Sequence, residues 1–159
     1  MPRDTERGAH DVLRAYLVRH KLKRSDQREI ILDALLRSDR HLSAEELLRS
    51  VKRRHPEVGR TTVYRTLKLL TEAGLARELV IDGQSHYERG YLREHHDHFI
   101  CTSCGAILEF TSPDIERLQE EFAARLGFAI EAHRHEIYGR CSRCGEADQP
   151  ASPARPASR

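Results

Sequence analysis

The chain has 159 residues, of which 38% are hydrophobic and 33% are charged, with no Trp and a formal net charge of +2 at pH 7. This length allows one domain or two small ones, and the composition is typical of a soluble, helix-rich protein. No apolar run reaches membrane-spanning length, and the first residues lack the hydrophobic segment of a signal peptide, so a membrane protein is excluded and a cytoplasmic one is expected. Because disulfides are rare in that compartment, the four Cys need another explanation.

The charge is unequal along the chain. Residues 1–83 contain 18 Lys and Arg against 13 Asp and Glu, whereas residues 84–159 contain 9 against 12. A basic half is a candidate for binding nucleic acid, although an ordinary solvated surface would also account for this excess.

The first half shows the apolar periodicity of helices. A first helix has an apolar face over residues 12–17, and a second has one over residues 30–35, with Ser25 in position to cap it. Ser43 and Glu46 have the spacing of a capping box, which predicts the start of a third helix.

A fourth helix is expected over residues 61–73, with Gly74 as its C-terminal stop. Two β-rich segments follow, joined by Asp82 and Gly83, a dipeptide typical of tight hairpins. Helices followed by a hairpin predict a winged helix-turn-helix.

The second half mixes predicted strands with one helix. Short strands are expected over residues 96–101 and 106–110, a helix over residues 113–126, and, from its alternation, a strand over residues 128–138. The tail, residues 147–159, is rich in Pro, Ala and Ser and is expected to be disordered.

Two Cys-x-x-Cys-Gly motifs are the most specific local pattern. They consist of Cys101 and Cys104, and of Cys141 and Cys144, each pair followed by Gly. Two intervening residues let one turn direct both sulfurs at one ion, and four thiolates complete a closed, structural zinc site. A redox pair is the alternative, but no thioredoxin-like context supports it.

A histidine-rich segment directly precedes the first Cys pair. If it is a strand, His95 and Asp97 point to one face, and His96 and His98 to the other. One strand could then supply two metal sites, whose imidazole and carboxylate ligands suit iron, zinc, manganese or cobalt. The alternative is an exposed polar segment that binds nothing.

Several longer motifs occur in a specific order along the chain. They are His41-Leu-Ser-Ala-Glu-Glu-Leu, Thr62-Val-Tyr-Arg-Thr-Leu, His95-His-Asp-His-Phe-Ile-Cys, Leu108-Glu-Phe and the last Cys pair. In this combination, over about residues 20–145, the chain resembles the ferric uptake regulator (Fur) family of bacterial metal-dependent repressors.

The resemblance implies an α+β fold in two domains. A winged helix-turn-helix DNA-binding domain would cover residues 1–84, followed by a hinge over residues 85–94. A small α/β dimerisation and metal-binding domain with the four-cysteine zinc site would cover residues 95–146.

The resemblance also implies which residues bind DNA and metal. The DNA-binding positions are Lys23, Arg60, Thr62, Tyr64 and Arg65. The regulatory metal site carries over to His41, Glu88, His96, His98 and Glu109, with His86 as an alternative to Glu88. An additional metal site carries over to His95, Asp97, Glu116 and His133.

The implied function is that of a homodimeric repressor that binds a palindromic double-stranded DNA operator. Each subunit would hold one structural Zn²⁺ and a regulatory Fe²⁺, for which Mn²⁺ or Zn²⁺ could substitute. Glu109, where the family's peroxide sensors usually carry Asp, favours iron sensing and control of iron uptake genes over peroxide or zinc sensing. A metalloenzyme and a zinc-bearing interaction module are the alternatives of other classes. The chain has no HExxH helix and no nucleophile beside a base, so we expect no enzyme.

Overall fold

The computed structural model describes residues 2–81, 83–93 and 95–145, and the side chains from residue 7 onward. The chain forms two compact units, Met1–Glu94 and His95–Arg159. The expected disordered tail lies outside the described residues. Among the described helices, none combines the length and the apolar character needed to cross a membrane.

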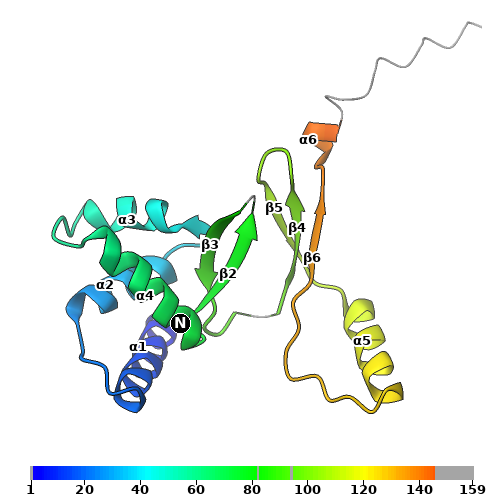
Figure 1. Ribbon diagram of the computed structural model, residues 1–159, viewed down its shortest axis with the longest axis horizontal. Helices are drawn as coiled ribbons and strands as arrows, with labels where there is room; N and C mark the ends of the chain where they lie inside the picture. The colour runs from blue at the N-terminus through cyan, green and yellow to red at the C-terminus, as the bar shows by residue number, and fades with distance from the viewer. Residues whose placement is uncertain (1, 82, 94, 146–159) are drawn as a thin grey trace, which may run out of the picture. The chain divides into compact units, whose positions relative to one another are not determined.

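The first unit is a winged helix-turn-helix, as the sequence predicted (Figure 1). Its elements are α1 (Pro2–Arg19), α2 (Asp26–Leu36), β1 (Leu42–Ser43), α3 (Ala44–Lys52), α4 (Arg60–Glu72), β2 (Ala76–Ile81) and β3 (Gln84–Arg89). The strands form an antiparallel sheet in the order β1-β3-β2, of which β2 and β3 make the wing.

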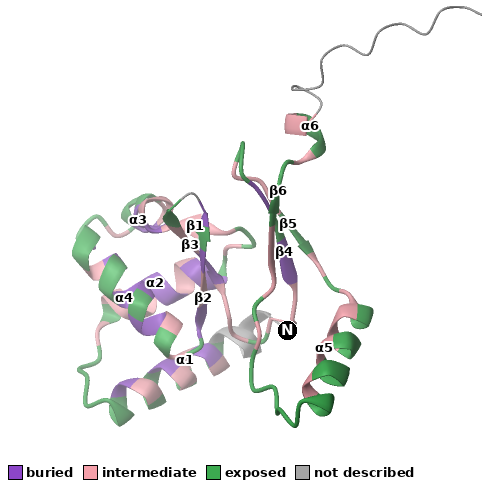
Figure 2. Cartoon of the chain, turned by 45° about the vertical axis from the view of Figure 1, so that its right-hand side comes forward, coloured by how far each residue is buried: buried purple, intermediate pink, exposed green. Residues whose placement is uncertain are grey.

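The helices of this unit share one hydrophobic core. Each contributes fully buried Leu side chains, including Leu13, Leu32, Leu47 and Leu67. Figure 2 shows these buried faces turned toward one another, while the outer faces of the same helices are exposed. The apolar faces predicted from periodicity are therefore the core.

The predicted start of α3 and the predicted end of α4 are confirmed, but the predicted side-chain cap of α2 is not. The Ser43–Glu46 capping box is confirmed: the Ser43 backbone N–H donates to Glu46 Oε2 at 2.8 Å, and the Glu46 N–H donates to Ser43 Oγ at 3.3 Å. Gly74 ends α4 with φ +70°. Ser25 occupies the cap position of α2, but its side chain makes no capping hydrogen bond, so that expectation is wrong. Its carbonyl oxygen accepts the backbone N–H groups of Arg28 and Glu29.

The hairpin is confirmed, and part of the segment expected as a hinge is strand. Ile81 pairs with Gln84, and Gly83 takes φ +74°, whereas Asp82 lies outside the described residues. Residues 85–89, the first part of the expected hinge, belong to β3. They are held there because all of them pair with β2, and two of them, His86 and Tyr87, also pair with β1.

The second unit is a small sheet with one long helix. Its elements are β4 (Asp97–Cys101), β5 (Ile107–Phe110), α5 (Pro113–Arg125), β6 (Glu136–Gly139) and the short α6 (Ser142–Gly145). The strand order is β5-β4-β6, with β5 antiparallel and β6 parallel to β4.

The strand expected over residues 128–138 is mostly wrong. Of the residues in this segment, only those from Glu136 onward belong to a strand, β6 (Glu136–Gly139). The reason is the length of β4: His98 already pairs with Glu136, so residues 128–134 run past the end of their neighbour and have no ladder to join.

Candidate metal centres and DNA-binding surface

The four Cys lie together at one end of the second sheet. Cys101 ends β4, Cys104 follows in the turn to β5, and Cys141 and Cys144 come after β6. All four sulfurs lie within 4.8 Å of one another, and those of Cys104 and Cys141 are 3.8 Å apart. Four sulfurs around one tetrahedral Zn²⁺ at about 2.3 Å would be about 3.8 Å apart, so the donor set and its spacing fit zinc.

Hydrogen bonds within this cluster make its thiols unequal in acidity. The backbone N–H of Cys141, 3.3 Å from Cys101 Sγ, is the largest cause that lowers the pKa of Cys101 to about 6. Hydrogen bonding with the sulfur of Cys104, and then of Cys141, raises the pKa of Cys144 to about 12. The cluster by itself therefore keeps protons at neutral pH, and a metal ion must displace them to make four thiolates.

A second cluster lies at the other end of β4. The Nε2 atoms of His95 and His133 are 2.9 Å apart, and His95 Nε2 is 3.2 Å from both Asp97 Oδ1 and Glu116 Oε1. Asp97 begins β4, Glu116 lies in the first turns of α5, and His133 lies in the segment before β6. The structure thus brings together the four side chains expected for the additional metal site.

The carboxylates of this cluster lack ordinary donors. Asp97 is 1% exposed, and within the described part of the chain neither of its oxygens accepts a hydrogen bond, nor does Glu116 Oε1. Buried carboxylate oxygens without donors are costly unless a cation compensates them. Such oxygens facing two imidazoles suit a divalent metal.

The expected alternation around β4 is confirmed. His95 and Asp97 belong to the cluster just described, whereas the rings of His96 and His98 meet edge to face with centroids 4.9 Å apart. Glu109 on β5 pairs directly with His98 in the sheet register. Three of the residues expected for the regulatory site therefore gather on one part of the second unit.

The two remaining residues of that expected site meet within the first unit. His41 precedes β1, and its Nε2 lies 3.5 Å from Oε2 of Glu88 on β3. The pairing of Leu42 with Tyr87 carries His41 opposite Glu88. His86 pairs one residue further along, with Ser43, and its Nδ1 lies 3.2 Å from the carbonyl oxygen of Gln84.

Two contacts in these clusters had not been anticipated from the sequence. The guanidinium of Arg93 pairs with the buried carboxylate of Glu88, and His135 Nδ1 lies 3.6 Å from Asp97 Oδ2. His135 alternates with His133, a signal that could have identified it. Nothing in the sequence marks Arg93, which lies in the irregular segment after β3.

The residues expected to bind DNA lie mainly on α4. Arg60, Tyr64 and Arg65 are exposed and Thr62 is half-buried, while Val63 between them belongs to the core. Lys23 is exposed in the segment between α1 and α2. The structure brings the four residues of α4 to the start of one helix, as the resemblance implied.

Glu45 on α3 orders two of these side chains. Its Oε1 lies 2.7 Å from Arg60 Nη2 and accepts a hydrogen bond from the Tyr64 hydroxyl at 3.1 Å. The Arg60 guanidinium also lies over the Tyr64 ring, 5.6 Å from its centroid. Glu45 thus holds the side chains of Arg60 and Tyr64 close to each other without a bound ligand.

Residues 19–138 match the model of the ferric uptake regulator family. The ferric uptake regulation protein of Campylobacter upsaliensis is 42% identical over 125 residues, which are 77% of this chain and 80% of that protein. The peroxide operon regulator of Bacillus subtilis is 32% identical over 77% of this chain and 83% of its own length. The solved structure of the Helicobacter pylori ferric uptake regulator, described as having three functional metal-binding sites, is similar with a TM-score of 0.80. It shares 32% identity and covers 91% of this chain and 96% of its own.

Proposed function

The chain belongs to the ferric uptake regulator family, and from this we propose that it represses transcription in the cytoplasm by binding an operator when Fe²⁺ fills a regulatory site. Members of this family are transcription regulators rather than enzymes. The observation that carries the proposal is one winged helix with exposed Arg60 and Tyr64, together with clusters of metal-binding side chains in the same chain.

We propose that the four-cysteine cluster holds one structural Zn²⁺ in each subunit. Its support is the spacing of the four sulfurs and a ligand set that leaves no open position. Bound there, zinc would fix the ends of β4 and β6 and the turns that follow them.

We propose that His41, Glu88, His96, His98 and Glu109 bind the regulatory ion. The support is that His41 and Glu88 meet in the first unit, while His96, His98 and Glu109 gather in the second. Glu88 is favoured over His86 because it lies opposite His41 in the sheet. An ion that uses ligands from both units would fix the orientation of the recognition helix relative to the second unit. In a dimer this orientation would set the spacing of the two recognition helices against the two half-sites of the DNA.

Iron is the proposed signal, and Mn²⁺ or Zn²⁺ the proposed substitutes. Imidazole and carboxylate ligands suit all three ions, so the ligand set alone does not choose among them. The Campylobacter relative, named for ferric uptake regulation, is more similar to this chain than the Bacillus peroxide regulator. We propose the cluster of His95, Asp97, Glu116 and His133 as an additional metal site.

We propose that α5 and the segment after it mediate homodimerisation. Large apolar side chains are exposed there, with Leu126 80%, Phe128 72% and Phe122 55% exposed. Contiguous apolar surface of this kind marks an interaction site. A second copy of the chain would cover it and would provide the two-fold symmetry that a palindromic operator requires.

The dimer proposal predicts the effect of a charge on this surface. Phe122→Asp should convert the protein to monomers, because it replaces an exposed apolar side chain of this surface with a charge that a second copy would have to desolvate. Sedimentation equilibrium of the zinc-loaded protein measures this, with Glu120→Ala on the exposed side of α5 as the control. A Phe122→Asp protein that remains dimeric would show that the interface lies elsewhere.

The proposed function itself is tested by metal-dependent DNA binding. We expect wild-type protein to bind a palindromic operator tightly only with Fe²⁺ or Mn²⁺ present, and affinity to fall steeply with salt as counterions leave the phosphates. Arg65→Ala should weaken specific binding by about 1–3 kcal/mol, since it removes a contact to base or phosphate. Lys52→Ala, an exposed cation on α3, is the control and should cost less. If Arg65→Ala binds the operator as tightly as wild type, α4 is not the recognition helix.

A further inference from the structure

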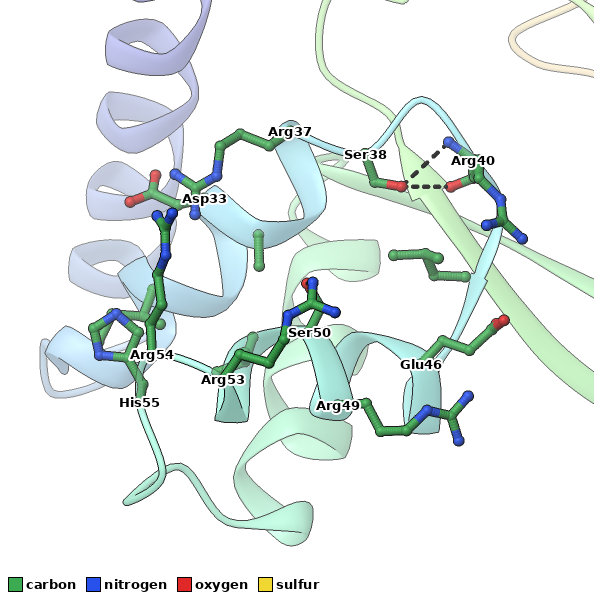
Figure 3. Close-up of a pocket in the computed structure, with 14 residues that line it drawn as sticks. Asp33, Arg37, Ser38, Arg40, Glu46, Arg49, Ser50, Arg53, Arg54 and His55 are labelled. Atoms are coloured by element: carbon green, nitrogen blue, oxygen red, sulfur yellow. Dashed lines mark hydrogen bonds between the residues drawn. The ribbon is translucent and has the colours of Figure 1, made fainter.

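We propose that the cleft between α2 and α3 binds a small organic anion that carries two or more phosphate groups. This cleft has a volume of about 770 Å³ and is lined entirely by residues of the first unit (Figure 3). That volume is within the range of about 300–1,000 Å³ of small-molecule sites. It is a site separate from the metal clusters and from α4.

The cleft is lined by an unusual number of cations. Figure 3 shows arginine side chains from the end of α2, the loop after it, α3 and the residues that follow α3 arranged around one space. They are Arg37, Arg40, Arg49, Arg53 and Arg54, with His55 beside them. Five guanidinium groups around one space repel one another, and an anion that binds several of them relieves this repulsion.

The two carboxylates of the cleft are already engaged with other groups. Asp33 Oδ1 lies 2.7 Å from Nε2 of His10 on α1. Glu46 accepts the Ser43 backbone N–H and hydroxyl at 2.8 and 2.9 Å in the capping box of α3. Asp33 is thus paired with His10, and the hydrogen bonds of Glu46 go to Ser43, with Arg40 as a further electrostatic neighbour.

The arginines retain most of their hydrogen-bonding capacity. Arg53 Nη2 donates to Ser50 Oγ at 3.3 Å. In the part of the chain that the structure describes, Arg37, Arg49 and Arg54 have no carboxylate partner. A guanidinium presents its donors in a planar fork that matches two phosphate oxygens, so several of them around one space favour a compact polyphosphate over a single carboxylate.

The apolar part of the lining indicates that the ligand has an organic part. Ile30 and Ala34 of α2, Leu42 of β1 and the buried Val51 of α3 line the cleft together with the arginines. A lining with both apolar and cationic side chains fits a molecule that has a ring or chain as well as phosphates.

DNA is the other source of phosphates, and the position of the cleft argues against it. The lining residues come from α2, α3 and the segments that flank them, and none comes from α4, β2 or β3. Arg60 and Tyr64, which the proposed function assigns to DNA, do not line the cleft. A small ligand could therefore bind without occupying the recognition surface.

The test uses the full-length, zinc-loaded protein and fluorescent mant-ADP as the probe. Wild type should bind mant-ADP but not mant-adenosine, and inorganic pyrophosphate should displace the probe. The double variant Arg37→Gln/Arg53→Gln should bind at least about tenfold more weakly, because two charge-assisted contacts are lost. The control Arg7→Gln/Lys52→Gln removes the same charge from exposed positions outside the cleft and should stay within about twofold of wild type.

Arg37 and Arg53 are exposed, so the double variant should fold, and circular dichroism with zinc content checks this. Equal mant-ADP affinity in the double variant and wild type, or binding of mant-adenosine as tight as that of mant-ADP, would overturn the proposal. So would a duplex DNA that displaces mant-ADP and binds the double variant about tenfold more weakly than the control, since the arginines would then contact the DNA backbone. Mant-ADP that remains bound at saturating duplex supports a separate site.

Discussion

Cys101→Ser is expected to release zinc and to unfold the second unit. Cys101 is 3% exposed, ends the central strand β4 and accepts the backbone N–H of Cys141, so its sulfur joins the two Cys pairs directly. Structural zinc sites contribute about 10–16 kcal/mol of apparent binding free energy, whereas a small domain is stable by about 5–15 kcal/mol. Loss of the metal should therefore remove most of the stability of this unit.

Two measurements and two further variants decide this prediction. Metal analysis should show one Zn²⁺ per chain in wild type and none in Cys101→Ser or Cys144→Ser, and thermal unfolding should show loss of the transition of the second unit. Ser103→Ala, an exposed change inside the same turn, should retain both zinc and transition. Serine variants that keep one tightly bound zinc per chain would contradict a site made of four thiolates.

Local chemistry explains which parts of the fold were predictable from the sequence. The Ser43–Glu46 box, the Gly74 stop and the Gly83 turn each depend on a few neighbouring residues, and the structure has all three. The prediction of a strand over residues 128–138 was mostly wrong because a strand also needs a partner strand. The length of that partner, β4, cannot be deduced from the sequence of residues 128–138. Residues 85–89, expected as part of a hinge, are strand for a similar reason, since pairing with β2 extends β3 to Arg89.

The metal ligands that local sequence predicts are likewise those that lie within one segment of the chain. Alternation within one segment separated His95 and Asp97 from His96 and His98, and the structure confirms the separation. Glu116 and His133 come from distant elements, and only resemblance to a known family could assign them to this cluster. Arg93, which pairs with Glu88, lies in an irregular segment where neither periodicity nor a motif identifies it.

His41→Ala is expected to retain the zinc, the fold and the dimer while weakening the effect of metal on DNA affinity. His41 precedes the short β1 and is not part of the core, so its loss should not unfold the winged helix. It is decisive because, with Glu88, it is the contribution of the DNA-binding unit to the proposed regulatory site. Without it an ion could still bind His96, His98 and Glu109, but it would hold the recognition helix less firmly. The coupling at stake is about 1–3 kcal/mol, typical of allosteric linkage.

The measurement is operator affinity across a titration with Mn²⁺ or anaerobic Fe²⁺, with an operator selected by the wild-type protein. His96→Ala should lose the metal response as His41→Ala does, because it removes a ligand from the other half of the proposed site. His86→Ala is the matched control: His86 lies on the same strand as Glu88 but beside Gln84, and its loss should leave the response intact. A weakened response in His86→Ala would instead place His86 in the site, as the alternative to Glu88. If His41→Ala and His96→Ala both respond as wild type does, the switch lies elsewhere. The cluster of His95, Asp97, Glu116 and His133 then becomes the regulatory candidate, because its buried carboxylate oxygens still require a cation.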